Sequence, residues 1–196
     1  MSIQQLMESL SHQNVPASTL YVIATPIGNI GDISLRALHI LGLADLIACE
    51  DTRTSKQLLS GYGLSSELVS AHKHNEREAA GYLIERLKRG ERIALVSDAG
   101  TPAVSDPGAR IVDAVREAGL NVVPVPGSSA AITALSASGL LDEHFLFYGF
   151  LPTKNAQRKD DLKTLTDTRA TLIFYEAPHR IEETLNALAD IFEPAR

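Results

Sequence analysis

The chain has 196 residues, of which 44% are hydrophobic, and it carries a formal net charge of −6. This acidic balance excludes a protein that grips nucleic acid through a broad basic surface, so any contact with RNA has to be local. Apolar runs stay short of the roughly 18 residues that a membrane-spanning helix needs, and residues 1–19 lack the basic start and apolar core of a signal peptide. We therefore expect a cytoplasmic protein without a membrane partner.

A flexible tail is predicted over residues 1–19, and from residue 20 short apolar runs alternate with segments of helical periodicity. That alternation is typical of a parallel α/β sheet. The predicted strands are Leu20–Ala24, Leu46–Glu50, Leu68–Ala71, Ile93–Ser97 and Asn121–Val125. The predicted helices are Ile33–Leu41, Thr52–Ser60, Glu76–Arg89, Ala109–Ala118 and Ser129–Ala137. Residues 20–142 are thus expected to form an α/β domain with a five-stranded, mainly parallel sheet and helices on both faces.

Single residues mark several element ends and part of the core. Asp32 is suited to cap the first helix and Asn75 the third, while Gly90 and Gly119 stand where the third and fourth helices should end. Cys49 has no cysteine partner and lies in an apolar run, which predicts a core position.

A second α/β domain is predicted to begin over residues 143–196. Its elements are a strand over Phe145–Phe150, a helix near Ala156–Leu165, a strand over Thr171–Tyr175 and a helix over Arg180–Phe192. Two strands and two helices are too few to close an independent layered core, so we expect this domain to be incomplete in the chain.

Turn-forming and polar residues follow every predicted strand of the first domain. The loops are Thr25-Pro-Ile-Gly-Asn29, Glu50-Asp-Thr-Arg53, His72-Lys-His-Asn-Glu76, Asp98-Ala-Gly-Thr-Pro102 and Pro126-Gly-Ser-Ser129. Each loop alone is an ordinary turn, but ligands of open parallel sheets bind at the carboxyl ends of the strands, where all five meet. The absence of a GxGxxG or GxxxxGK[ST] sequence argues against the two commonest nucleotide-binding classes.

Together with Asp106-Pro-Gly108 and Phe174-Tyr-Glu-Ala-Pro-His-Arg180, these motifs resemble the RNA-modifying branch of the tetrapyrrole methylase superfamily, the class III methyltransferases. The resemblance covers Leu20 to Phe192. It implies methylation of a cytidine 2′-hydroxyl in 16S ribosomal RNA of the small subunit, with S-adenosylmethionine in a cleft between two α/β domains of a homodimer. Enzymes of the superfamily that act on tetrapyrroles usually carry Gly-Asp-Pro after the fourth strand. Gly100-Thr-Pro102 stands there instead, which favours RNA as the substrate.

The resemblance also implies the cofactor contacts. They are Ile27, Gly100, Thr101, Pro102, Val104, Ser128, Ser129, Phe150 and Leu151, and Asp98 is added because its carboxylate can accept a hydrogen bond. Adenine and the methionine chain need apolar walls and a few backbone hydrogen bonds, which such residues can supply. Asp98 is suited either to accept a hydrogen bond from the ligand or to hold its own loop in an Asx turn.

A general base within hydrogen-bond reach of the ribose hydroxyl would take its proton during methyl transfer. The candidates at the strand ends are Glu50, Asp51, His74 and the neighbouring His72. Each has a structural alternative: Asp51 can pair with Arg53, Glu50 can cap the next helix, and the histidines can bond to loop backbone. No third ligand follows the two histidines at a spacing typical of zinc, so no metal is expected.

The nearest approach to a basic patch is a group of four residues that we predict to contact RNA: Lys154, Arg158, Lys159 and Lys163. Asp160 and Asp161 interrupt it, and such mixed runs are often solvated helix faces. Two other functions stay open, namely a small-molecule methyltransferase of the tetrapyrrole type and a non-catalytic module that binds the ribosome.

Overall fold

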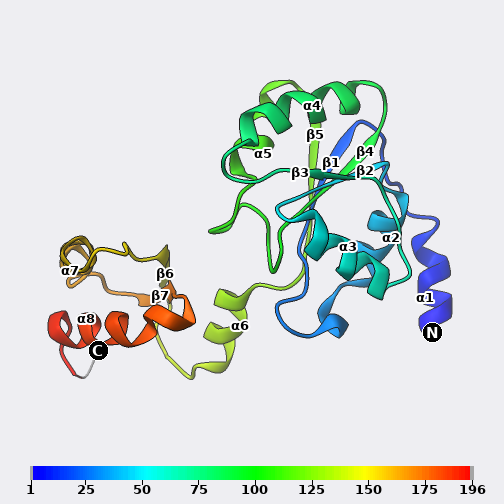
Figure 1. Cartoon of the computed structure of the whole chain (residues 1–196). Helices are drawn as coiled ribbons and strands as arrows, with labels where there is room; N and C mark the ends of the chain where they lie inside the picture. Colours follow the sequence, from blue (N-terminus) through cyan, green and yellow to red (C-terminus); the bar gives the residue numbers. More distant parts are fainter. Residues whose placement is uncertain (1, 195–196) are drawn as a thin grey trace. The chain divides into compact units, whose positions relative to one another are not determined.

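The computed structural model describes residues 2–194 and divides into two compact units, with the boundary between Ala130 and Ala131 (Figure 1). The sequence predicts the boundary later, after Asp142. Helix α6 (Ala130–Ala137) accounts for the difference, because the backbone N–H of Ala131 donates to the Tyr175 hydroxyl at 3.1 Å. The helix therefore belongs mostly with the second unit.

The first unit contains the predicted five-stranded sheet, and every pair of neighbouring strands is parallel. The strand order is β3-β2-β4-β1-β5. The strands are β1 (Thr19–Ile23), β2 (Leu46–Cys49), β3 (Leu68–Ser70), β4 (Arg92–Val96) and β5 (Asn121–Val125). The fold prediction is confirmed, with strand bounds within one residue of the expected ones.

Alternate residues of the strands belong to two hydrophobic cores, one on each face of the sheet. Helices α4 (Glu76–Lys88) and α5 (Ala109–Glu117) cover one face, and α2 (Leu35–Leu43) and α3 (Thr52–Gly61) cover the other (Figure 1). Cys49 is fully buried in the second core, as its apolar run predicts. Since each helix follows its strand, all four helices begin at the carboxyl edge of the sheet.

One predicted helix cap, Asp32, is wrong, and the other, Asn75, stands at the N-cap position without a side-chain cap bond. Asp32 ends the short 3-10 helix η1 (Ile30–Asp32), and the cap of α2 is Ser34, whose hydroxyl accepts from the Ala37 N–H at 3.1 Å. Asn75 precedes α4 but makes no cap bond. Its side chain instead spans the loop before the helix, accepting from His72 N–H and donating to the Ser70 carbonyl. The Asn75 side chain thus binds the loop backbone instead of the amides of the helix N-terminus.

Glycines end two helices as predicted, and a helix occurs where a tail was expected. Gly90 and Gly119 have φ of 94° and 72°, a conformation that closes a helix at little steric cost in glycine. Residues 3–10 form α1 (Ile3–Leu10), which begins with a reciprocal capping box between Ser2 and Gln5.

The second unit contains β6 (Phe145–Phe150), α7 (Asn155–Thr164), β7 (Thr171–Tyr175), η2 (Pro178–Arg180) and α8 (Ile181–Ile191). Strands β6 and β7 pair in parallel, and a small core forms around Leu151, Leu162 and Ala187. That this unit is the start of a larger α/β domain stays a prediction. Over residues 2–194, no helix combines the length and the apolar character required to cross a membrane.

Candidate functional site

Three loops meet at the carboxyl edge of the sheet, after the neighbouring strands β4, β1 and β5. Thr25 and Gly100 exchange backbone hydrogen bonds of 2.9 and 3.1 Å, which ties the loop after β1 to the loop after β4. The Thr101 hydroxyl donates to the Ser128 carbonyl at 3.0 Å and adds the loop after β5. The predicted cofactor residues of the first unit therefore converge on one place.

Glycine is required at two points of this convergence. Gly100 has φ of 85°, and a Cβ there would lie 3.5 Å from the Ile27 methyl and 3.9 Å from the Ser128 carbonyl. A Cβ on Gly127 would lie only 2.9 Å from the Cβ of Ala24. The closely packed neighbour of Gly127 is thus the residue that directly follows β1, whereas Gly100 faces two residues of the predicted cofactor group.

The loop from Thr101 to Gly108 is strained. Ala103 and Ser105 have φ of 67° and 60°, a conformation that costs energy in residues with a side chain and that clusters at functional sites. Val104, which lies between these two residues, is 39% exposed. Pro102, just before them, is buried.

Carboxylates gather beside these loops. Asp98 accepts from the Asp51 N–H at 3.2 Å, so its side chain links the loop after β4 to the loop after β2. Burial raises the pKa of Glu50, and the negative charges of Asp98 and Asp106 raise it further. Burial and the charge of Asp98 likewise raise the pKa of Asp106. We did not predict Asp106 as a site residue, although it stands in the quoted Asp106-Pro-Gly108 motif.

Asp51 is held in the ionised form by Arg53. Its carboxylate caps α3 and pairs with the Arg53 guanidinium at 2.9 Å. Hydrogen bonds from the side chain and backbone of Arg53 lower the pKa of Asp51 to about 2. An acid this strong is a poor proton acceptor, so Asp51 has the structural role that the sequence left open, and Glu50 does not cap the helix.

The two histidines lie in the loop before α4. The His74 N–H donates to His72 Nδ1 at 3.3 Å, and the rings stand edge to face with centroids 6.0 Å apart. His74 is exposed, whereas His72 is half-buried and contributes to the electrostatic environment of Glu50. Within residues 2–194, no three side chains of His, Cys, Asp or Glu are grouped so as to hold a metal ion.

Phe150 and Leu151, the predicted cofactor residues of the second unit, differ in exposure. Phe150 is 51% exposed and packs edge to face on Tyr175. Leu151 is buried in the core of its unit, and only its backbone is available for a polar contact. The Arg180 guanidinium already occupies the Leu151 carbonyl at 2.9 Å.

The Phe174–Arg180 motif stabilises the chain around Leu151, which directly follows β6. Burial opposes the ionisation of Glu176, but bonds from Thr184, the Ala177 N–H and the Arg180 guanidinium lower its pKa. The ionised Glu176 thus orients Arg180 toward the Leu151 carbonyl. The sequence singled out this motif, but its contacts follow only from the structure.

Arg158 is not available to RNA, contrary to our prediction. It is 1% exposed and donates to the carbonyls of Pro152 and Thr153 and to Glu183. Its position on α7 points the side chain under the turn after β6, where those carbonyls need donors. Arg158 therefore supports the fold.

The three lysines of the predicted RNA group remain at or near the surface. Lys159 pairs with Asp190 at 2.7 Å, and Lys163 pairs with Asp160 at 3.0 Å. Lys154 is exposed at the start of α7. Acidic residues of α7 and α8 thus pair with two of the three lysines.

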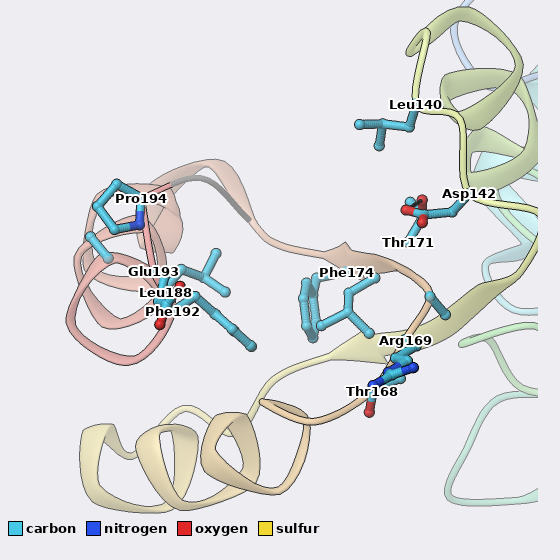
Figure 2. Close-up of a pocket in the computed structure, with 13 residues that line it drawn as sticks. Leu140, Asp142, Thr168, Arg169, Thr171, Phe174, Leu188, Phe192, Glu193 and Pro194 are labelled. Atoms are coloured by element: carbon cyan, nitrogen blue, oxygen red, sulfur yellow. Dashed lines mark hydrogen bonds between the residues drawn. The ribbon is translucent and has the colours of Figure 1, made fainter.

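A hollow of about 950 Å³ opens in the second unit, and Figure 2 shows the side chains around it. It lies over β7 and α8, where Phe174, Leu188 and Phe192 give it an apolar floor. The residues that line it do not include any predicted cofactor, catalytic or RNA residue. The hollow is therefore formed by residues other than those of the predicted site.

Comparison with known proteins identifies close relatives. Ribosomal RNA small subunit methyltransferase I of Haemophilus influenzae is 52% identical over 177 residues, which cover 90% of this chain and 62% of that protein. The protein of the same name from Xylella fastidiosa is 54% identical over 178 residues, covering 91% of this chain and 65% of the relative. The chain thus spans about three fifths of the length of these relatives.

Solved structures with a similar fold include a cobalt precorrin-4 methyltransferase, with a TM-score of 0.65 and 18% identity, covering 91% of this chain and 78% of that one. Another is uroporphyrin-III-C-methyltransferase from Thermus thermophilus, with a TM-score of 0.52 and 25% identity, covering 70% and 65%. Residues 19–196 also match the family described as Tetrapyrrole (Corrin/Porphyrin) Methylases. The chain therefore belongs to the tetrapyrrole methylase family.

Proposed function

We propose that the protein is an S-adenosylmethionine-dependent methyltransferase that modifies a cytidine 2′-hydroxyl in 16S ribosomal RNA. We further propose that it acts in the cytoplasm, as a homodimer, on the small ribosomal subunit. The names of relatives that share about half of its residues support the RNA substrate. Gly100-Thr-Pro102, in place of the Gly-Asp-Pro of tetrapyrrole enzymes, favours the same choice.

The observation that carries the proposal is the convergence of the loops after β1, β4 and β5. Their backbones are fixed by bonds between Thr25 and Gly100 and between Thr101 and Ser128. Ile27 and Val104 add apolar surface beside these backbones. Rigid backbone polar groups flanked by apolar side chains fit a ligand that combines an adenine ring with an amino-acid chain.

When bound, S-adenosylmethionine supplies an electrophilic methyl group, and the residues of the chain align and deprotonate the acceptor. Alignment of the hydroxyl with the methyl group supplies much of the acceleration in such a displacement. Glu50 is the favoured base, because its raised pKa makes it a better proton acceptor than Asp51.

The test supplies the full-length protein with methyl-labelled S-adenosylmethionine and offers assembled small subunits, naked 16S RNA or a tetrapyrrole. We expect label in RNA, at a ribose 2′-oxygen, and Gly100→Val should remove it by straining a left-handed position and crowding Ile27. Label in the tetrapyrrole would favour the small-molecule alternative. A protein that binds subunits but not S-adenosylmethionine would be a non-catalytic module.

The substrate should be the folded subunit. A protein with a net charge of −6 gains little from counterion release on free RNA, so recognition has to depend on shape and a small basic contact. We propose that this contact consists of Lys154, Lys159 and Lys163 and does not include the buried Arg158. A homodimer would present it twice.

Replacing Lys154 and Lys163 together with glutamine should weaken binding to small subunits and reduce the slope of log K against log salt by about 2. The affinity for S-adenosylmethionine should not change. Lys88→Gln is the matched control, because Lys88 pairs with Glu85 three residues away at 3.1 Å, as Lys163 does with Asp160 at 3.0 Å. Equal salt slopes for the double variant and the wild type would contradict the assignment.

A further inference from the structure

The strained loop after β4 needs an anchor, since two of its side-chain-bearing residues have positive φ. Within the loop, the Ala103 N–H donates to the Pro107 carbonyl at 3.1 Å and the Val104 N–H donates to the Thr101 carbonyl at 3.4 Å. These bonds close the loop on itself, and its far end, Gly108, continues into α5, where its carbonyl accepts from the Val112 N–H at 2.9 Å. The buried Gly108 N–H is the group that can attach this end of the loop to another element.

Glu76, the first residue of α4, makes the attachment. Its side chain is 8% exposed, and its Oε1 accepts from the Gly108 N–H at 2.6 Å. Gly108 itself fits tightly, since a Cβ there would lie 3.1 Å from a Leu95 methyl. The Arg110 guanidinium lies 4.0 Å from Glu76 Oε2 and supplies a partner for the buried charge.

The bond joins two segments that are 32 positions apart in the sequence. On one side is α4, which is packed firmly into the core of the first unit through Ala79, Ala80 and Leu83. On the other side is the end of the loop that carries Gly100, Thr101 and Val104. A buried backbone amide left without an acceptor costs free energy, so the presence of an oxygen within reach of the Gly108 N–H is what matters most here.

We propose that Glu76 is a positioning residue for the cofactor. By holding the Gly108 N–H, it keeps the Thr101–Gly108 loop in its strained shape, with Val104 presented toward the bound S-adenosylmethionine. The inference rests on the proposed function. Glu76 does this because its side chain is long enough for Oε1 to accept from the Gly108 N–H, and the negative charge of the carboxylate is secondary.

Two conservative variants distinguish the effect of the side-chain length of residue 76 from the effect of its charge. Glu76→Gln keeps the Oε1 acceptor but removes the charge, while Glu76→Asp keeps the charge but is one methylene too short to reach Gly108. We expect calorimetry on the full-length protein to give an S-adenosylmethionine affinity within about threefold of the wild type for Glu76→Gln. For Glu76→Asp the affinity should be lower by about tenfold or more.

In methylation assays, Glu76→Asp should raise KM for S-adenosylmethionine without raising KM for small subunits, a split that general destabilisation does not produce. Glu78→Ala is the control, because Glu78 is exposed in the same first turn of α4. The opposite ranking, with aspartate near the wild type and glutamine weak, would overturn the inference, as would equal affinities for all variants. If the wild type binds no S-adenosylmethionine, the proposed function itself fails.

Discussion

Replacing Glu50 with glutamine should lower kcat for RNA methylation by about 10²–10⁴ while leaving S-adenosylmethionine affinity almost unchanged. Glutamine preserves the size of the side chain and its hydrogen-bonding oxygen but cannot take a proton. Glu50 stands among Asp98 and Asp106, whose charges add to burial in raising its pKa. Single-turnover assays at saturating cofactor and subunit concentrations measure the effect on the chemical step.

The pH profile gives the second measurement on Glu50. A base works only when deprotonated, so the wild-type rate should rise with pH, and the midpoint of this rise should lie above the ordinary glutamate pKa because the Glu50 pKa is raised. Asp51→Asn is the matched control: asparagine caps α3 as well as aspartate does, so the rate should stay within about threefold of the wild type. A large loss in Asp51→Asn with none in Glu50→Gln would refute our choice of base.

Replacing Arg158 with alanine should destabilise the second unit by about 3 kcal/mol, which is the range expected for truncating a large buried side chain that leaves polar groups unpaired. The variant removes the donor to the Thr153 carbonyl and one of two donors to the Pro152 carbonyl, and it opens space beneath the turn after β6. Its Glu183 partner is 70% exposed and can be solvated, so the loss comes mainly from the carbonyls and from packing. Urea unfolding of the full-length protein measures the change.

Lys159→Ala provides the control for Arg158, because Lys159 is the next residue of α7 and its pair with Asp190 lies nearer the surface. Exposed ion pairs contribute at most about 1 kcal/mol, so this variant should unfold almost as the wild type does. If Arg158→Ala unfolded normally and instead weakened binding to small subunits, Arg158 would be an RNA contact after all.

The neighbouring basic residues of α7 illustrate what a sequence cannot resolve. Lys154, Arg158, Lys159 and Lys163 form one charged group along the chain, yet Arg158 is buried while Lys154 is exposed. The α-helical period places residues four apart on nearly the same face, but the turn after β6 covers only part of α7. Which cation it covers depends on the carbonyls of Pro152 and Thr153, and their direction is set by tertiary packing.

Asp51 and Glu50 make the same point for the candidate site. Adjacent carboxylates at the end of a strand are equal candidates in the sequence. Asp51 is the N-cap residue of α3 and meets Arg53, whereas Glu50, directly after β2, is subject to burial and to the negative charges of Asp98 and Asp106. The pKa values of the pair therefore move in opposite directions.

The sequence alone was enough to predict the succession of strands and helices along the first unit, the parallel sheet and the edge at which polar loops gather. It also carried the resemblance to a methyltransferase family. These features depend on local periodicity, on turn residues and on the right-handed crossovers that parallel strands require. The tertiary structure alone decided that Ser34 caps α2, that Arg158 is buried and that Glu76 holds Gly108. Each of these depends on which partner packing brings within about 3 Å, a distance over which hydrogen bonds form and which no spacing along the chain specifies.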